Sequence, residues 1–212
     1  MNKLSISRGN SKLGNIPNIS LTPGLCGSCA KDVPCRGTCY AHKAYRQYPR
    51  TRAAWDGNLK LWQEDTDEYW MQLKSFLSRT EKDRFRFHVA GDIPSMQYMC
   101  SIVVTAAEVF PHIKFLCYTK RYDYLFEMRD VKLPPNLSLV VSRWPGWRTE
   151  QGIELGKHFP SAYMVPKGES YTDVYPELHG EIVFRSPGDC THCRQCWNLP
   201  HSMVKGVLFD EH

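Results

Sequence analysis

Cysteine is the residue type in this sequence whose number and spacing most directly indicate chemistry. The chain has 212 residues and nine cysteines, and seven of these fall in two short segments. The first segment holds Cys26, Cys29, Cys35 and Cys39, the second holds Cys190, Cys193 and Cys196, and Cys100 and Cys117 stand alone. Clustered cysteines in a protein that is not secreted are typical metal ligands. We therefore expect the seven to bind metal, and the isolated two to be small buried hydrophobic residues.

The C-x2-C-x2-C pattern of residues 190–196 favours an iron–sulfur cluster. Its spacing matches the first three cysteines of a bacterial cluster-binding run, in which each thiolate binds a different iron of one cubane. A zinc site is usually built from two separated C-x2-C pairs, so a third cysteine at this spacing has no role in a single zinc site. Three incidental reduced thiols are the non-functional alternative.

The cysteines of residues 26–39 lie in a loop rich in glycine and proline, and three arrangements fit them. In the first, the C-terminal trio and one further ligand, Cys39 or a loop neighbour, hold a single [4Fe-4S] cluster. In the second, Cys29, Cys35 and Cys39 hold a cluster with one open iron, and Cys26 completes a closed site with the C-terminal trio. In the third, all four N-terminal cysteines bind zinc. We expect the first, because a chain of this size has little room for two clusters.

Composition and apolar patterning predict one globular domain over residues 1–212. Hydrophobic residues make up 42% and charged residues 23% of the chain, close to the average for globular proteins. The longest apolar stretches, such as residues 102–107, are far shorter than the roughly 20 residues of a membrane span. The N-terminus lacks the apolar segment of a secretory signal. We therefore expect a cytoplasmic protein with no membrane contact, in a compartment where disulfides rarely persist.

Six short runs rich in β-branched and aromatic residues alternate with segments of helical periodicity. The predicted strands are residues 18–21, 85–89, 114–118, 137–141, 162–165 and 181–184. The predicted helices are residues 52–64, 66–77 with Thr66 as its cap, 94–110, 123–129 and 149–158. This alternation predicts right-handed βαβ units, a mostly parallel sheet and the α/β class. Six such units over residues 18–189 would form an open, partial barrel.

In parallel α/β folds, functional side chains collect at the carboxyl ends of the strands. Both cysteine segments follow predicted strands. Five further polar residues also do so, and these are His88, Asp92, Lys120, Arg143 and Lys167. We therefore expect cysteine clusters 26–39 and 190–196 to come together at the barrel mouth, with these five as candidate cofactor-binding residues.

Each of the five has a second interpretation. His88 is either a cluster ligand or proton donor, or, as we expect, an interior histidine with satisfied hydrogen bonds. Asp92 either binds a ligand or caps the helix that follows it. The basic residues Lys120, Arg143 and Lys167 either receive a small anionic ligand or compensate the negative charge of a thiolate-bound cluster.

At these motifs the sequence resembles a family of bacteriophage proteins, the gene product eighty-eight type, itself similar to radical-SAM enzymes. The matching stretches are LTPGLCGSCAKDVPCRGTCYA (21–41), FRFHVAGDIPS (85–95), KFLCYTKRYD (114–123), NLSLVVSRWPG (136–146) and CTHCRQCW (190–197). They run through most of the chain, and their combination is specific. The resemblance implies a phage origin, an iron–sulfur cluster and a partial (β/α)6 barrel like the radical-SAM core, and it implies no particular activity.

One motif departs from that of radical-SAM enzymes. They use C-x3-C-x2-C after the first strand, which leaves one iron free for S-adenosylmethionine, whereas this chain has C-x5-C-x3-C at Cys29, Cys35 and Cys39. The departure weakens the expectation of catalysis more than that of cluster binding. Gly91 and Asp92 lie where those enzymes carry a glycine-rich motif for the methionine amino group, so by analogy the acidic side chain would serve an ammonium there.

Three hypotheses of different classes follow. The leading one is a [4Fe-4S] protein in the cytoplasm of an infected bacterium, with a small anionic ligand or a host protein as its partner. The second is an active radical-SAM enzyme that cleaves S-adenosylmethionine. The third is a zinc-stabilised module that binds nucleic acid or a host protein. The net charge of +5 supports this third class, but no stretch combines basic residues with interleaved aromatics.

Overall fold

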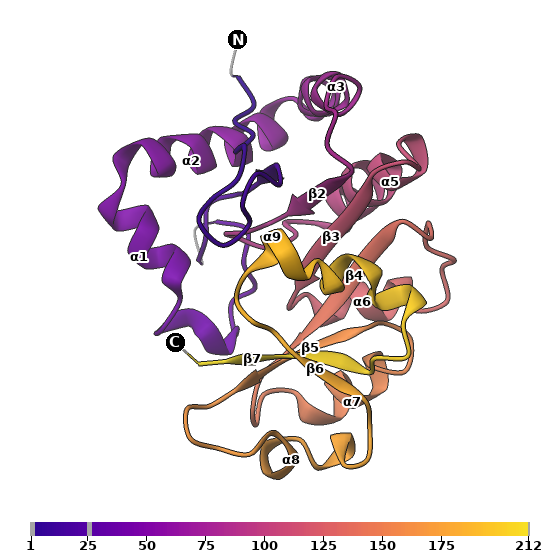
Figure 1. Ribbon diagram of the computed structural model, residues 1–212. Coiled ribbons are helices and arrows are strands. Elements are labelled where there is room, and N and C mark those ends of the chain that lie inside the picture. Colours follow the sequence, from indigo (N-terminus) through magenta and orange to yellow (C-terminus); the bar gives the residue numbers. More distant parts are fainter. Residues whose placement is uncertain (1–2, 25–26, 212) are drawn as a thin grey trace.

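A seven-stranded parallel sheet forms the centre of the computed structural model, which describes residues 3–24 and 27–211 (Figure 1). Its strands are β1 (Asn18–Ile19), β2 (Arg84–Phe87), β3 (Lys114–Thr119), β4 (Leu137–Arg143), β5 (Ser161–Val165), β6 (Val183–Arg185) and β7 (Gly206–Asp210). Their order is β1-β2-β3-β4-β5-β7-β6, and each neighbouring pair is parallel. The α/β class and the parallel sheet are therefore confirmed.

All six predicted strands are present, and β7 is a seventh that the sequence patterning missed. It lies beyond residue 189, the expected limit of the barrel, and inserts between β5 and β6. Gly206 opens the strand because a Cβ there would lie 2.5 Å from the Tyr163 ring and 2.7 Å from the Ser161 carbonyl oxygen. Only glycine therefore lets β7 pair this closely with β5.

Helical segments fill most of the connections between strands. They are α1 (Tyr40–Gln47), α2 (Pro49–Glu64), α3 (Thr66–Leu77), α4 (Met96–Tyr98), α5 (Thr105–Val109), α6 (Tyr122–Met128), α7 (Thr149–Leu155), α8 (Tyr171–Val174) and α9 (Cys190–Cys193). A π-helical stretch at Met99–Val104 joins α4 to α5. The expected cap of α3 is wrong by one residue, because Asp65 and not Thr66 accepts the capping hydrogen bond, from the Glu68 N–H at 2.9 Å. In the described part of the chain, no helix has the length and apolarity to cross a membrane.

The helices and the sheet share one large core. Phe85, Phe87 and Phe115 project from β2 and β3 into a buried cluster with residues of α2, α3, α5 and α6. Cys117 is buried in the same cluster, as expected, whereas Cys100 is exposed on the π-helical stretch, so its predicted burial is wrong.

The opposite face of the sheet is covered by residues 189–201, within the connection from β6 to β7. Trp197 packs there against Leu116 and Val140, and its indole N–H donates to the Phe85 carbonyl oxygen at 3.1 Å. In Figure 1 this gold segment passes in front of β3 and β4. The sheet is open, with β1 and β6 at its edges. A single crossing segment thus covers the face that a barrel would turn inward.

Asn58 of α2 holds the segment before β1 in place. It is fully buried, its Oδ1 accepts from the Ser5 N–H at 2.7 Å, and its Nδ2 donates to the carbonyl oxygens of Ser5 at 2.9 Å and Ser20 at 3.0 Å. The helix therefore supports the segment that contains Ser5 and the residue that follows β1.

Replacement of Asn58 by alanine should destabilise the protein by about 3 kcal/mol, because it leaves buried backbone groups without hydrogen-bond partners. The measurement is the free energy of unfolding from denaturant titration. Gln63→Ala, at an exposed position of the same helix, is the control and should change that free energy by less than about 0.5 kcal/mol. Equal effects of the two substitutions would contradict the role of Asn58.

Candidate functional site

The loop after β1 brings the N-terminal cysteines to the carboxyl edge of the sheet. The Ser28 hydroxyl accepts a hydrogen bond from the Asp92 N–H at 2.8 Å and donates to the Thr22 carbonyl oxygen at 3.1 Å. Gly91 has a φ of +77°, and a Cβ there would lie 2.4 Å from the Ser28 Oγ. The glycine therefore permits the close approach that places Cys29 in the electrostatic range of Asp92.

The thiols of Cys29, Cys35 and Cys39 lie close enough to change one another's ionisation. The Cys35 thiol donates a hydrogen bond to the Cys39 sulfur and, with the N–H groups of Ala41 and His42 in the first turn of α1, lowers the pKa of Cys39 to about 5. The same hydrogen bond raises the pKa of Cys35, and burial raises that of Cys29 to about 11. The three cysteines are therefore electrostatic neighbours, and their surroundings favour the thiolate form at Cys39.

Asp92 connects the ends of β2 and β3 beneath these cysteines. It is 5% exposed, and it accepts hydrogen bonds from the Thr119 hydroxyl at 2.6 Å and from the N–H groups of Lys120 at 2.9 Å and Ile93 at 2.8 Å. Burial raises its pKa. The predicted capping role is wrong, because Ser95 caps α4. Since both carboxylate oxygens already accept hydrogen bonds, Asp92 has little capacity left for a ligand.

Lys120 adds a positive charge to the N-terminal set, the name we give to Cys29, Cys35 and Cys39. Its Nζ lies 5.6 Å from the centre of the Trp144 ring, and its charge lowers the pKa of Cys29 and Cys35. A small hollow opens among these loops, and its lining consists of Gly24, Cys29, Ala30, Val33, Cys35, Arg36, Cys39 and His42. The set therefore combines three sulfur ligands, a nearby cation and a small space.

Cys190, Cys193 and Cys196 form the second group, which we call the C-terminal set. The Cys190 N–H donates to the Lys12 carbonyl oxygen at 2.8 Å, which holds α9 against the N-terminal segment. Burial raises the pKa of Cys196 to about 11, although the Tyr118 hydroxyl donates a hydrogen bond to its sulfur. The charges of Cys190 and Cys193 also act on Cys196, so the three side chains are electrostatic neighbours.

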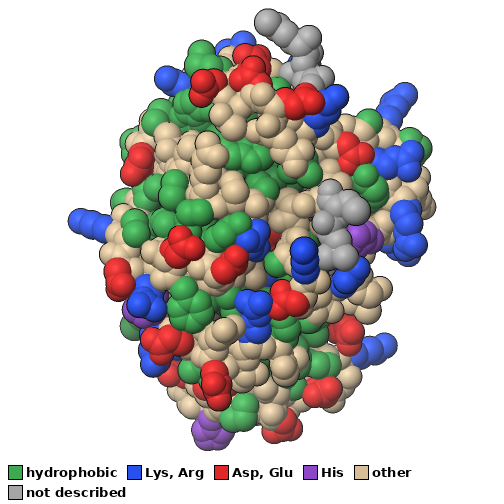
Figure 2. Space-filling view, turned by 180° about the vertical axis from the view of Figure 1, so that it is seen from behind, with side chains coloured by type: hydrophobic (Ala, Val, Ile, Leu, Met, Phe, Trp, Pro, Cys, Tyr) green, Lys and Arg blue, Asp and Glu red, His purple; other side chains and the backbone are tan. Residues whose placement is uncertain are grey.

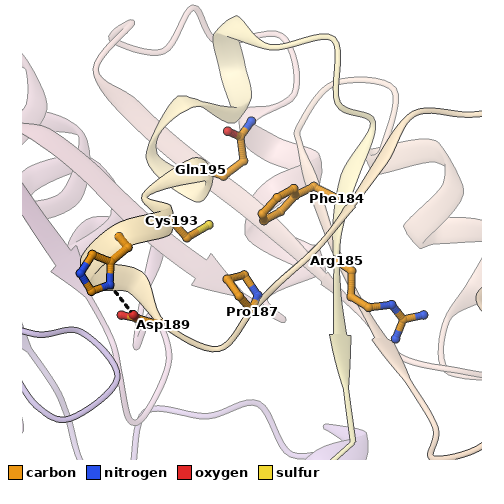
Figure 3. A pocket seen from close by; sticks show the side chains of 7 residues that line it. Phe184, Arg185, Pro187, Asp189, Cys193 and Gln195 are labelled. Atoms are coloured by element: carbon orange, nitrogen blue, oxygen red, sulfur yellow. Dashed lines mark hydrogen bonds and ion pairs between the residues drawn. The ribbon is translucent and has the colours of Figure 1, made fainter.

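An open cavity of about 560 Å³ adjoins the C-terminal set (Figure 3). Its lining consists of Phe184, Arg185, Pro187, Asp189, His192, Cys193 and Gln195. Asp189 caps α9 by accepting from the Thr191 N–H at 2.8 Å, and its other oxygen lies 2.6 Å from His192 Nδ1. Figure 3 shows the Cys193 sulfur directed toward the space beside Phe184 and Pro187 and away from the histidine.

The two sets have separate surroundings. Lys120 and Asp92 act on the N-terminal set, whereas Arg86 and Tyr118 act on the C-terminal set. Within residues 3–24 and 27–211, no hydrogen bond joins a cysteine of one set to a cysteine of the other. Cys26, the remaining candidate ligand, lies outside the described residues.

His88 lies in the interior and faces the helices. Its backbone is left-handed, with a φ of 55°, and its ring centre lies 5.4 Å from that of Tyr98. Neither ring nitrogen has a hydrogen-bond partner in the described part of the chain, in contrast to the satisfied histidine that we expected. Burial, with help from the charge of Arg86, lowers its pKa to about 3. The ring is therefore neutral at physiological pH.

Arg143 and Lys167 lie apart from the cysteine sets. Arg143 is 1% exposed, pairs with Glu177 at 2.7 Å and lies over the rings of Tyr163 and Tyr175. Its charge is thus already compensated within the protein. Lys167 is exposed in the turn after β5. Of the predicted basic residues, Lys120 is the one that lies at a cysteine set.

Arg86, Tyr118 and His42 are site residues that the sequence analysis missed. A signal for Arg86 was present, because strict alternation in Arg84-Phe85-Arg86-Phe87 predicts that both arginines lie on one face of a strand. Tyr118 lies on the same face of the neighbouring strand, where the Arg86 guanidinium is 5.0 Å from its ring centre. No sequence signal distinguished His42 from the other histidines.

The described side chains do not converge on a single metal ion. Among residues 3–24 and 27–211, no three His, Cys, Asp or Glu side chains converge closely enough to hold one ion. The ligands of a tetrahedral zinc ion lie about 2.3 Å from the metal, and therefore about 4 Å from one another.

The family model described as Gene product 88 matches residues 2–199 of this chain. The matched range includes both cysteine sets and strands β1 to β6, and it ends before β7. No curated protein and no solved structure matches significantly.

The buried His88 should make stability depend on pH. Its folded pKa of about 3 lies below the ordinary 6.5, so its contribution is fully present above pH 6.5 and is lost as the pH falls from 6.5 toward 3. Between pH 7.5 and 5.5 this loss is about 1.4 kcal/mol. The measurement is the free energy of unfolding at both pH values.

In the His88→Asn variant this part of the loss should disappear, since asparagine tolerates the left-handed backbone and does not titrate. His112→Asn, at an exposed position, is the control and should keep the parent's pH dependence. If His88→Asn also keeps it, the buried neutral histidine is not its source.

Proposed function

The chain belongs to the Gene product 88 family, a family of phage gene products, and we propose that it is an iron–sulfur protein with a [4Fe-4S] cluster on Cys29, Cys35 and Cys39. The observation that carries this proposal is the grouping of these three thiols at the carboxyl edge of the sheet. The cluster, when bound, supplies one-electron redox chemistry.

The surroundings of the N-terminal set are suited to an anionic cluster. Thiolates are the ligands of iron–sulfur clusters, and the hydrogen bond from Cys35 favours the thiolate form of Cys39. Lys120 offsets the negative charge that three thiolates bring. The cation therefore lowers the electrostatic cost of assembling the site. This is the second of the two roles that the sequence analysis gave to the basic residues.

A second candidate function is the reductive cleavage of S-adenosylmethionine. It is favoured by the number of ligands, because a cubane held by Cys29, Cys35 and Cys39 would have one iron without a cysteine ligand. In this function Asp92 would hold the surrounding loops in position. It would not bind the ligand directly, since its oxygens already accept three hydrogen bonds.

The zinc-stabilised, nucleic-acid-binding alternative has less support. The side chains of the described residues do not converge on a single ion. Across the middle of the face seen from behind, Lys and Arg lie among Asp and Glu and form no basic stripe (Figure 2). An iron–sulfur protein of the cytoplasm of the infected host is therefore the function that we propose.

Protein purified without oxygen should contain iron and sulfide in equal amounts and absorb visible light. The triple variant C29S/C35S/C39S should lose about four irons and four sulfides per chain, because a cubane cannot be held without its thiolates. Cys100→Ser, which changes an exposed cysteine outside both sets, is the control and should keep the parent's metal content. Zinc without sulfide in the parent protein would contradict the proposal.

If the second candidate function holds, reduced protein incubated with S-adenosylmethionine should release 5'-deoxyadenosine, measured by chromatography. The triple variant C29S/C35S/C39S should release none, and Cys100→Ser should match the parent. Complete absence of the product under strong reductant would rule out cleavage and leave cluster binding untouched.

A further inference from the structure

The C-terminal set lies on the sheet face that carries an arginine without an acidic partner. Arg86 projects from β2 to this face, where its guanidinium lies 5.0 Å from the centre of the Tyr118 ring. Its Nε is buried and has no hydrogen-bond partner in the described part of the chain. The neighbouring arginine on the same face, Arg84, pairs with Asp83. Arg86 is therefore a partly buried cation in need of a counter-charge.

Buried charges in proteins are normally paired, because an unpaired one loses its hydration without compensation. Cys190 and Cys196 pack in the same cluster as Tyr118, over whose ring Arg86 lies, and the charge of Arg86 acts on both cysteines. Three neutral thiols would give the guanidinium nothing to pair with. Three thiolates bound to a metal cluster would provide an anionic partner, because their negative charge exceeds the positive charge of an oxidised cubane core.

Tyr118 makes a second contact of the same kind. Its hydroxyl donates a hydrogen bond to the Cys196 sulfur, and Cys196 is 7% exposed within the cluster of Leu116, Val140 and Trp197. A donor directed at a buried sulfur stabilises negative charge there, as the hydrogen bonds around iron–sulfur clusters do. Arg86 and Tyr118 thus prepare one place for anionic sulfur.

We propose that Cys190, Cys193 and Cys196 hold a second iron–sulfur cluster, separate from that of the N-terminal set, with Arg86 as its counter-charge and Tyr118 as its hydrogen-bond donor. Both residues are positioning residues that act through the sulfurs. The Cys193 sulfur faces the open cavity beside Phe184 and Pro187 (Figure 3). Cys193 would therefore be the ligand of this cluster that faces the open cavity.

Metal analysis of two triple variants separates the two sites. If both clusters exist, the parent holds about eight irons and eight sulfides, and C29S/C35S/C39S and C190S/C193S/C196S each hold about four. Unchanged iron in C190S/C193S/C196S overturns the second cluster and leaves the first in place. Unchanged iron in C29S/C35S/C39S overturns the first and leaves the second. Circular dichroism of each variant establishes that it is folded.

The roles of Arg86 and Tyr118 are tested with all cysteines of the C-terminal set present. In the C29S/C35S/C39S background, Arg86→Gln and Tyr118→Phe should each make the reduction potential of the remaining cluster more negative, since each removes a group that favours the extra electron. Arg84→Gln, on the same strand and face, is the matched control and should leave the potential unchanged. Potentials of the Arg86 and Tyr118 variants equal to that of the control would overturn these roles.

Discussion

The position of the N-terminal cysteines depends on one buried carboxylate. Asp92 accepts hydrogen bonds from Thr119 and Lys120 at the end of β3, and its own N–H donates to Ser28 in the loop after β1. A buried carboxylate is costly unless it is fully hydrogen-bonded, so the loops that supply its partners are held to one geometry. The same contacts determine where the Lys120 side chain and Cys29 lie. The proposed cluster site is thus built around a group that need not touch the cluster.

The two faces of the sheet are covered by different parts of the chain. Helices cover one face and supply most of the core, whereas residues 189–201 cover the other and carry the C-terminal set. Each set has its own cation, Lys120 for the first and Arg86 for the second, and both cations act on Tyr40, whose hydroxyl donates to the Val89 carbonyl oxygen. Two anionic clusters, as proposed, would repel each other, and a cation beside each would reduce that repulsion.

Six strands could be predicted from the sequence because their β-branched and aromatic runs are distinct, whereas β7 begins with Gly206 and ends with Asp210, which hides its apolar middle. The grouping of the cysteines could not be predicted from spacing, because it depends on the route of residues 189–201 across the sheet. His88 shows a second limit. Strand alternation places it on the face of Arg86, but its left-handed backbone turns the ring toward Tyr98 and the helices. Asp92 was found as a polar residue at a strand end, but its three hydrogen bonds come from residues that are distant in sequence or irregular in structure.

The place of β7 in the sheet sets an order of events during synthesis. β6 pairs with β7 and with no other strand in the described part of the chain, and β7 is synthesised after β6 and after the C-terminal set. Strands β1 to β5 can pair as they emerge, so the N-terminal set is assembled early. The C-terminal set lies between β6 and β7 and is fixed only when β7 closes the gap. A nascent chain of this protein therefore leaves the three thiols of the C-terminal set without their final surroundings until β7 has been made.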